Sequence, residues 1–476
     1  MGELCKTKTK RTIYNNHFMK VKEFEYTNDQ LAALADIENW VYKPIETHYD
    51  CFYCLTGSAG TGKTTILKEL IKNLRSPFEH RVCISAPTHK AKKVLEQKTG
   101  CEDSETVQSL IGLRPDVDLE HFNPAEPQFA PMALKTINSY KLVIIDEASM
   151  VNNDLYQYIC DEAIKSKIKV LFTGDTLQLP PINEFKSKTL TEPHNKYNLT
   201  EIVRQELTNP LITLLDILRK DIENNTNEYQ NFLQVIPENV NEKGEGFVVC
   251  DKKQFAEELI KHFRLPEYKE DKNFLRYLSW TNKSIQEVNR FIRERAFGLT
   301  ELLTKDELLL AYRSLSDEHQ NVRLTNSDDY IVENITETTS EHGVRVWVIN
   351  IKALDINFTS TLEVVIPTKA NYNQFLIEHD DKLNTAKLKK GKAWVGYYQY
   401  RNSYCLLENL YDGNFLKVKK DIDYGYGVTI HKSQGSTYHT VFINGKDINK
   451  NQDETVKKKL WYVGLSRAST KVFINL

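Results

Sequence analysis

The sequence predicts an α/β protein built on a parallel sheet of the phosphate-binding P-loop type, and three observations support this. Residues 57–64 read G-S-A-G-T-G-K-T, between an apolar run at 51–55 and apolar residues at helical spacing over 66–74. Two further apolar runs, 141–145 and 168–173, end in Asp-Glu and Gly-Asp. A strand–loop–helix unit together with buried strands that end in carboxylates is typical of an open α/β nucleotide-binding sheet.

The glycine-rich loop matches the pattern G-x-x-x-x-G-K-T without a gap. Its glycines allow backbone N–H groups to surround phosphate oxygens, and the following helix adds the positive end of its dipole. We expect Lys63 to reach the β- and γ-phosphates and Thr64 to ligate Mg²⁺. The context disfavours the alternative of a turn that binds nothing, so the chain is predicted to bind a nucleoside triphosphate. The predicted phosphate-binding residues are Gly57, Ser58, Ala59, Gly60, Thr61, Gly62, Lys63, Thr64 and Thr65.

Acidic and amide side chains follow the next two predicted strands. Asp146 is suited to the Mg²⁺ shell and Glu147 to polarising the attacking water. Acidic pairs also cap helices, but beside a phosphate loop the catalytic interpretation is favoured. Gln178 is placed to contact the γ-phosphate or its water, and a turn rich in Gly and Pro is the alternative.

Other polar residues are candidates for contacts with nucleic acid or with the reacting phosphate. Thr88, His89 and Lys90 follow a third apolar run and are suited to holding a sugar-phosphate backbone or a base face. Arg204 and Arg467 lie far in sequence from the phosphate loop. If they meet it in space, each is able to neutralise developing phosphoryl charge. Lone arginines are usually solvated or ion-paired, so spacing alone promotes neither.

Composition limits the remaining possibilities. A length of 476 residues predicts two to four domains. The net charge of −2 means that a nucleic acid would have to bind in a local basic groove. No apolar run reaches the length of a membrane span and no signal-peptide core begins the chain, so we expect no membrane contact and a cytoplasmic location. Cys51 and Cys54 form a CxxC without a second pair at zinc spacing, so buried core cysteines in a reducing compartment are expected.

Taken together, the motifs resemble the ordered motif set of superfamily 1 helicases, within the RecD-like 5′-to-3′ branch. Nine motifs in the right order are far more specific than any one of them. The set consists of Gln30, 57–64, 86–91, 146–150, 174–181, Arg204, 279–282, 427–436 and 462–468. The resemblance implies two RecA-like P-loop NTPase domains, each a parallel sheet flanked by helices. It also implies ATP and Mg²⁺ in the cleft between them and single-stranded DNA across their top.

The resemblance assigns roles residue by residue. Gln30 would contact adenine, Asp146 and Thr64 would hold Mg²⁺, Glu147 would be the catalytic base, and Gln178 would couple the γ-phosphate to DNA. The implied catalytic residues are Lys63, Glu147, Gln178, Arg204 and Arg467, the two arginines completing the site from the second domain. The implied DNA contacts are Pro87, Thr88, His89, Thr106, Thr281, Asn282, Thr429, His431 and Lys432.

The resemblance also implies how the chain is divided. Residues 13–203 would form the first RecA-like domain, residues 204–320 with 425–476 the second, and residues 1–12 a basic tail that is most simply solvated. A Pro-rich segment at about 112–135 would be a pin that splits the duplex, and a surface loop is the alternative. Phe122 and Phe129 are both candidates for its tip.

Residues 321–424 contain short β-like runs separated by polar turns, which suits a small SH3-like β-barrel insertion. Within it, four lysines at 387–392 precede Trp394, Tyr397, Tyr398 and Tyr400. This segment is suited to binding DNA by stacking, to bracing the pin, or to forming a solvated basic face over aromatic residues.

The expected activity is that of an ATP-dependent DNA helicase that translocates on single-stranded DNA, 5′-to-3′, in replication or recombination. The expected partners are single-stranded, duplex and forked DNA, with single-strand-binding or replisome proteins as candidates. A monomer is expected, in the bacterial host cytoplasm if the chain is phage-encoded. The alternative is an ATP-gated switch that remodels nucleic acid or protein without travelling. A nucleotide kinase is disfavoured because it does not explain the paired distal arginines.

Overall fold

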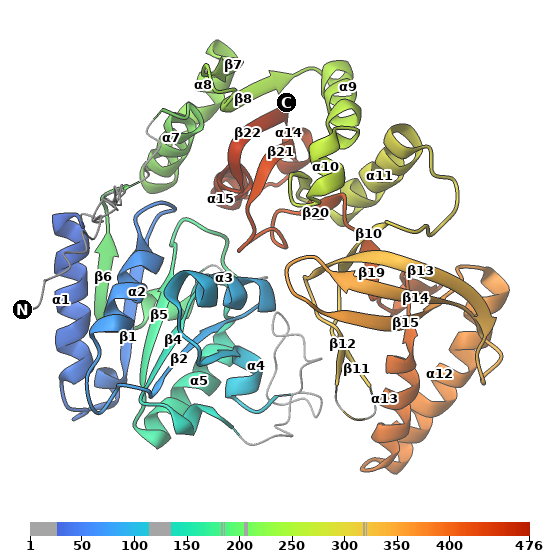
Figure 1. The fold of residues 1–476 in the computed structure, drawn as a ribbon, viewed down its shortest axis with the longest axis horizontal. Helices are drawn as coiled ribbons and strands as arrows, with labels where there is room; N and C mark the ends of the chain where they lie inside the picture. The colour runs from blue at the N-terminus through green and yellow to red at the C-terminus, as the bar shows by residue number, and fades with distance from the viewer. Residues whose placement is uncertain are drawn as a thin grey trace, which may run out of the picture.

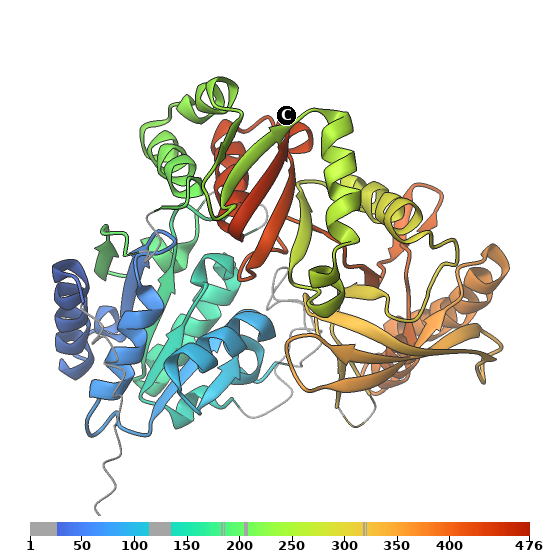
Figure 2. The same cartoon turned by 45° about the horizontal axis from the view of Figure 1, so that its top comes forward.

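The computed structural model describes residues 26–113, 135–181, 184, 186–203, 208–317, 319 and 321–476. Within these residues the chain forms three six-stranded sheets and two small two-stranded ones. Figure 1 shows the first sheet at lower left, the second above it and the third at right, and Figure 2 shows the same three bodies after rotation. The basic tail at 1–12, most of the pin segment with Phe122 and Phe129, and Arg204 lie outside the described residues.

The first sheet has the order β3-β2-β4-β5-β1-β6, and all of its pairs are parallel. The continuous apolar runs become strands that are buried on both faces, as expected for a sheet covered by helices on both sides. Its strands are β1 (Phe52–Gly57), β2 (Val82–Ala86), β3 (Ser104–Thr106), β4 (Leu142–Ile145), β5 (Lys169–Gly174) and β6 (Asn195–Leu199). The accompanying helices are α1 (Asn28–Tyr42), α2 (Lys63–Asn73), α3 (His89–Thr99), α4 (Val107–Leu110), α5 (Asn153–Ser166) and α6 (Lys188–Thr191).

Alternate side chains of these strands enter two separate hydrophobic cores. Cys54 and Phe172 belong to one core, and Leu55 and Leu171 to the other. Cys51 is also buried in the first core, and burial raises the pKa of the Cys54 thiol to about 12. Both cysteines are therefore buried in the core, Cys51 just before β1 and Cys54 within it.

The second sheet has the order β20-β9-β21-β22-β8-β7 and is parallel except for the pair β7·β8. It combines strands from two stretches of chain on either side of a long insertion. Its strands are β7 (Glu238–Val240), β8 (Gly246–Cys250), β9 (Leu275–Ser279), β20 (Gly427–Thr429), β21 (Tyr438–Asn444) and β22 (Ala468–Asn475). Its helices are α7 (Leu211–Asn224), α8 (Glu228–Val235), α9 (Lys252–Phe263), α10 (Pro266–Glu270), α11 (Asn282–Ile292), α14 (Gly445–Ile448) and α15 (Glu454–Ser466).

The third sheet, within the insertion, has the order β16-β15-β14-β13-β10-β19. Because β10 pairs with both β13 and β19, this sheet begins before residue 321. The N–H groups of Asp421 and Ile422 donate to the Leu406 carbonyl at 2.8 and 3.2 Å, which brings the two edges of the sheet together at one point. Its strands are β10 (Leu308–Ala311), β13 (Asp329–Thr339), β14 (Arg345–Ala353), β15 (Thr359–Val365), β16 (Tyr404–Cys405) and β19 (Ile422–Tyr424). The two small sheets pair β11 (Leu315–Ser316) with β12 (Val322–Leu324) and β17 (Leu410–Asp412) with β18 (Phe415–Val418).

Two packed helices, α12 (Lys369–Lys389) and α13 (Ala393–Ser403), extend from this sheet (Figure 1). The expectation of β structure throughout 321–424 is therefore wrong for these residues. The buried positions Phe375, His379 and Ala386 follow helical spacing, and Tyr400 stacks on Phe375 with ring centroids 5.6 Å apart. The four lysines at 387–392 are exposed around the turn between the helices. None of the helices in the described ranges is long and apolar enough to cross a membrane.

Candidate functional site

The phosphate loop joins β1 to α2 at the edge of the first sheet. Gly62 caps the start of α2 with φ 87°, a conformation that favours glycine, and a Cβ at this position would collide with the Gln30 amide. Lys63 Nζ donates to the carbonyls of Gly57 at 2.5 Å and Ser58 at 3.3 Å. The ammonium group therefore already lies over the loop where phosphate oxygens would bind.

Gln30 lies against the same loop, at the start of α1. Its backbone N–H donates to Thr27 Oγ1 at 3.2 Å and its Oε1 accepts from the Thr27 N–H at 3.1 Å, a capping box. Its Nε2 donates to the Thr61 carbonyl at 3.1 Å, and the side chain is 1% exposed. The capping box thus fixes Gln30 beside the phosphate loop.

Three carboxylates follow β4 and β5, namely Asp146, Glu147 and Asp175. Thr173 Oγ1 donates to Asp146, and Glu147 follows in the left-handed region with φ 50°. Burial and then the charge of Asp146 raise the pKa of the Glu147 carboxyl, while Arg467 and Lys63 act to lower it. The Thr64 hydroxyl and the Asp146 carboxylate are oxygen donors of the kind that Mg²⁺ prefers, so the residues present fit that ion.

The second α/β body contacts the nucleotide side directly through α15. The Tyr462 hydroxyl accepts from the Ala59 N–H at 3.1 Å and donates to Asp175 Oδ2 at 3.0 Å. One turn earlier, Lys459 Nζ donates to the carbonyls of Thr176 at 2.9 Å and Gln178 at 3.1 Å. The phosphate loop and the turn after β5 are therefore both held by one helix of the other body.

Of the two predicted arginines, Arg467 lies within the described residues and Arg204 lies outside them. Arg467 is 6% exposed and donates to the carbonyls of Val463 and Ser436 and to Ser466 Oγ, all in its own body. Its charge nevertheless acts from the second body to lower the pKa of Glu147. Val203, which immediately precedes Arg204 in sequence, donates its N–H to the Gly60 carbonyl at 2.9 Å.

The predicted DNA contacts in the first body follow β2 and β3. Thr88 caps α3 and Thr106 caps α4 through their hydroxyls, and Pro87 is buried. His89 is the first residue of α3, and burial and the charge of Lys92 lower its pKa to about 4. These side chains therefore cluster where the strands end.

The corresponding residues of the second body follow β9 and β20. Thr281 caps α11 and donates to Asp447 Oδ2 at 2.9 Å, and Asn282 is exposed beside it. Burial lowers the pKa of His431 to about 4. Lys432 Nζ donates to Asn326 Oδ1 at 3.0 Å, in the insertion.

The DNA-contact candidates of the first body border those of the second. Gly435 lies against Ala91 of α3, since a Cβ built on this glycine would be 3.5 Å from the Ala91 Cβ. Thr429, which is 7% exposed, ends β20 on the same side of the second sheet. The N–H of Lys432 approaches the Thr429 hydroxyl at 3.4 Å, so the turn after β20 folds back over that strand end. The structure thus brings the strand ends of both bodies to one shared edge.

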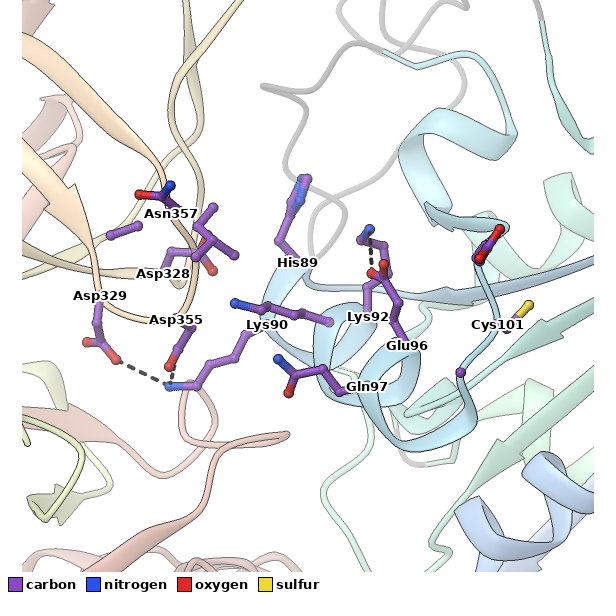
Figure 3. A pocket seen from close by; sticks show the side chains of 15 residues that line it. His89, Lys90, Lys92, Glu96, Gln97, Cys101, Asp328, Asp329, Asp355 and Asn357 are labelled. Carbon is purple, nitrogen blue, oxygen red and sulfur yellow. Dashed lines mark hydrogen bonds and ion pairs between the residues drawn. The ribbon is translucent and has the colours of Figure 1, made fainter. Parts of the chain in front are cut away.

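A cavity of about 690 Å³ separates α3 from the sheet of the insertion (Figure 3). Lys90 reaches across it to Asp329 Oδ2 at 3.3 Å and Asp355 Oδ2 at 3.4 Å. Although burial acts to lower the pKa of Lys90, the charge of Asp329 raises it above its ordinary value. Arg276 from β9 also binds Asp329 Oδ2, at 3.1 Å, so one carboxylate joins all three bodies.

The sequence does not predict several of these contacts. It makes Lys90 a candidate for the DNA backbone, but it carries no local signal for the ion pairs with Asp329 and Asp355, because these partners lie more than 230 residues away. Tyr462 was recognisable only as the first residue of the motif at 462–468, and Gln434 only as part of 427–436. Their contacts across the cleft depend on tertiary structure.

Comparison with known proteins agrees with this geometry. Residues 40–235 match the family model of an AAA domain and residues 424–474 that of the UvrD-like helicase C-terminal domain. A solved structure on DNA unwinding at forked duplex DNA by two coordinating Pif1 helicases has the same fold, with a TM-score of 0.53 and 16% identity over 95% of this chain and 92% of its own. An uncharacterized protein of Acanthamoeba polyphaga mimivirus is 25% identical over 94% of this chain and 98% of its own length.

The ordered motifs, the two α/β sheets and these matches define the class: over most of its length the chain is similar to superfamily 1 helicases of the RecD- and Pif1-like branch. Within that class it is similar to the ATP-dependent DNA helicase dda of Enterobacteria phage T4. The two are 23% identical over 444 residues, which cover 88% of this chain and 93% of the phage protein.

Proposed function

We propose that this chain is an ATP-dependent DNA helicase that moves 5′-to-3′ along single-stranded DNA and separates the duplex ahead of it. The observation that carries this proposal is the Gln178–Gln434 hydrogen bond of 3.2 Å, which joins the turn beside the nucleotide site to the loop beside the DNA-contact candidates. The names of the phage relative and of the Pif1 structure, which speak of a DNA helicase and of unwinding at forked duplex DNA, support the same activity. The 5′-to-3′ direction rests on the likeness to this branch.

ATP would act by closing the cleft between the two sheets. Lys63 would hold the γ-phosphate from the first body, and Arg467 would reach the same phosphate from the second by leaving its present carbonyl partners. The Val203–Gly60 contact places the chain just before Arg204 at the loop, which supports the same role for Arg204. Hydrolysis would remove the shared contact and allow the cleft to open.

The chemistry at the reacting phosphate would depend on the carboxylates. Glu147, whose pKa is raised by burial and by Asp146, is suited to accept a proton from the attacking water. Mg²⁺, held by Thr64 and Asp146, would neutralise charge on the phosphate oxygens. Gln30 would select adenine from the position that its capping box fixes.

The insertion and the pin would act on the DNA itself. We assign residues from β10 to β19 to an SH3-like domain of this branch, with a start at about 308 because β10 pairs with both β13 and β19. The segment at 112–135, with Phe122 or Phe129 at its tip, would be the pin that splits the duplex. The strand-end residues Thr88, His89 and Thr429 would contact the single strand between the two bodies.

The test is ATP hydrolysis by the full chain with and without single-stranded DNA, together with ATP-driven displacement of a labelled strand from a tailed duplex. Strong stimulation with displacement supports the helicase. Stimulated hydrolysis without displacement supports the non-travelling switch instead, and unstimulated transfer of phosphate to a nucleotide would show a kinase.

A further inference from the structure

The Tyr462 hydroxyl has one partner from the phosphate loop and one from the turn after β5. It accepts from the Ala59 N–H at 3.1 Å and donates to Asp175 Oδ2 at 3.0 Å. The side chain is 3% exposed and that of Asp175 is 1% exposed. A phenylalanine would fill the same volume, so the hydroxyl has a role that packing does not explain.

The contact continues from Asp175 to Gln178, the residue proposed to couple the γ-phosphate to DNA. Asp175 Oδ1 accepts from the Leu177 N–H at 2.9 Å and so shapes the turn that presents Gln178. A buried carboxylate is tolerated only with such partners. A continuous chain of hydrogen bonds therefore runs from Ala59 through Tyr462 and Asp175 to the backbone beside Gln178.

The donors and acceptors in this chain of hydrogen bonds indicate how a bound nucleotide would change it. Backbone N–H groups of a phosphate loop are the donors that surround phosphate oxygens. In this structure one of them, Ala59 N–H, is engaged by a residue of the other body. The Tyr462 phenol stays neutral and able to donate to Asp175, because burial and the Asp175 charge raise its pKa.

We propose that Tyr462 is a positioning residue that senses phosphate in the loop and transmits its presence to the Gln178 turn. Nucleotide phosphate and the Tyr462 hydroxyl compete for the Ala59 N–H, and release of Tyr462 frees the Asp175 turn to reposition Gln178. This inference rests on the proposed function, since it assigns part of the coupling between ATP and DNA.

The decisive variant is Tyr462→Phe, which removes the hydroxyl and keeps the ring. Removing the competitor should tighten binding of a non-hydrolysable ATP analogue by about threefold, because a net hydrogen bond is modest. Loss of the link should lower the stimulation of hydrolysis by single-stranded DNA by about tenfold. The matched control is Tyr404→Phe, which removes a buried hydroxyl that donates to Ser340 Oγ at 2.7 Å in the insertion. This control should change neither quantity.

The double variant Tyr462→Phe with Gln178→Ala distinguishes a coupling role of Tyr462 from a merely structural one. If Tyr462 acts through Gln178, adding Tyr462→Phe to Gln178→Ala causes no further loss of stimulation. Additive losses, weaker analogue binding or unchanged stimulation in Tyr462→Phe would each overturn the inference. Asp175→Asn breaks the chain one step further on and replaces Tyr462→Phe if that variant fails to fold. If the wild type shows no DNA-stimulated hydrolysis, the proposed function fails, and the analogue affinities still test the competition for Ala59.

Discussion

The side-chain amide of Gln434 donates a 3.2 Å hydrogen bond to the side-chain oxygen of Gln178. The first residue follows β20 and the second follows β5, so the bond crosses from one α/β body to the other. Both side chains are less than 10% exposed, at 8% and 7%. If Gln178 contacts the nucleotide as proposed, a change there would have a direct polar path to the loop that contains His431 and Lys432.

Gln434→Met should uncouple hydrolysis from DNA. Methionine has a similar length but no donor, which leaves the buried Gln178 oxygen without this partner. We expect the ratio of the hydrolysis rates with and without single-stranded DNA to fall about tenfold, which corresponds to about 1.4 kcal/mol. Gln452→Met, at an exposed position before α15, serves as the control and should leave the ratio intact. A Gln434→Met ratio equal to that of the wild type would show that the bond has no part in coupling.

Lys63→Ala should abolish ATP turnover and strand displacement while the protein remains folded. The ammonium group contacts only carbonyls of its own loop among the described hydrogen bonds, at Gly57 and Ser58, so little folding energy depends on it. Turnover measured by phosphate release should fall to background, and the melting temperature should change by no more than about 2 °C. Hydrolysis at the wild-type rate in this variant would contradict the assignment of the site.

Lys90→Met should loosen the contact between α3 and the insertion. Breaking a buried ion pair by removing one partner costs about 3–5 kcal/mol, and Arg276 keeps Asp329 paired, so we expect roughly 3 kcal/mol or less. The readout is the free energy of unfolding in urea, together with faster amide exchange in α3 and at 353–357. Lys92→Met is the matched control, since Lys92 pairs with Glu96 of its own helix at 3.5 Å. Equal losses in the two variants would argue against a link between the bodies.

Stability should fall as the pH falls from about 6.5 to about 4. Burial lowers the pKa of both His89 and His431 to about 4, from an ordinary value near 6.5. Between those values the unfolded chain binds more protons than the folded one, so the stabilisation is fully present above pH 6.5 and is lost as the pH drops. Urea unfolding at pH 7.5, 6 and 5 measures this loss. His431→Gln should lose less stability over that range than the wild type, and an equal loss would show that His431 titrates normally when folded.

The nucleotide side of the site was largely predictable because its features are local. A phosphate loop needs its glycines, its lysine and a following helix within a dozen residues, and those constraints appear directly in the sequence around Lys63. Buried parallel strands likewise appear as apolar runs, and the carboxylates at Asp146 and Glu147 follow one of them. The structure confirms the α/β class for the same reason.

The insertion and the cross-cleft contacts were less predictable. The short β-like runs favoured β structure for the insertion at 321–424, whereas Phe375 and His379 carry the helical spacing that the structure follows. Tyr462 and Ala59 are 403 residues apart, and no local pattern specifies such a pairing. Long-range polar partners depend on how the two α/β sheets meet, which single-sequence patterns do not encode.

Translocation in the 5′-to-3′ direction is best tested by strand displacement from two partial duplexes, one with a 5′ and one with a 3′ single-stranded tail, with ATP and Mg²⁺. We expect displacement from the 5′-tailed duplex alone, and none with Lys63→Ala. Displacement from the 3′-tailed duplex alone would contradict the proposed direction. Failure on both, with hydrolysis still stimulated by single-stranded DNA, would contradict translocation itself.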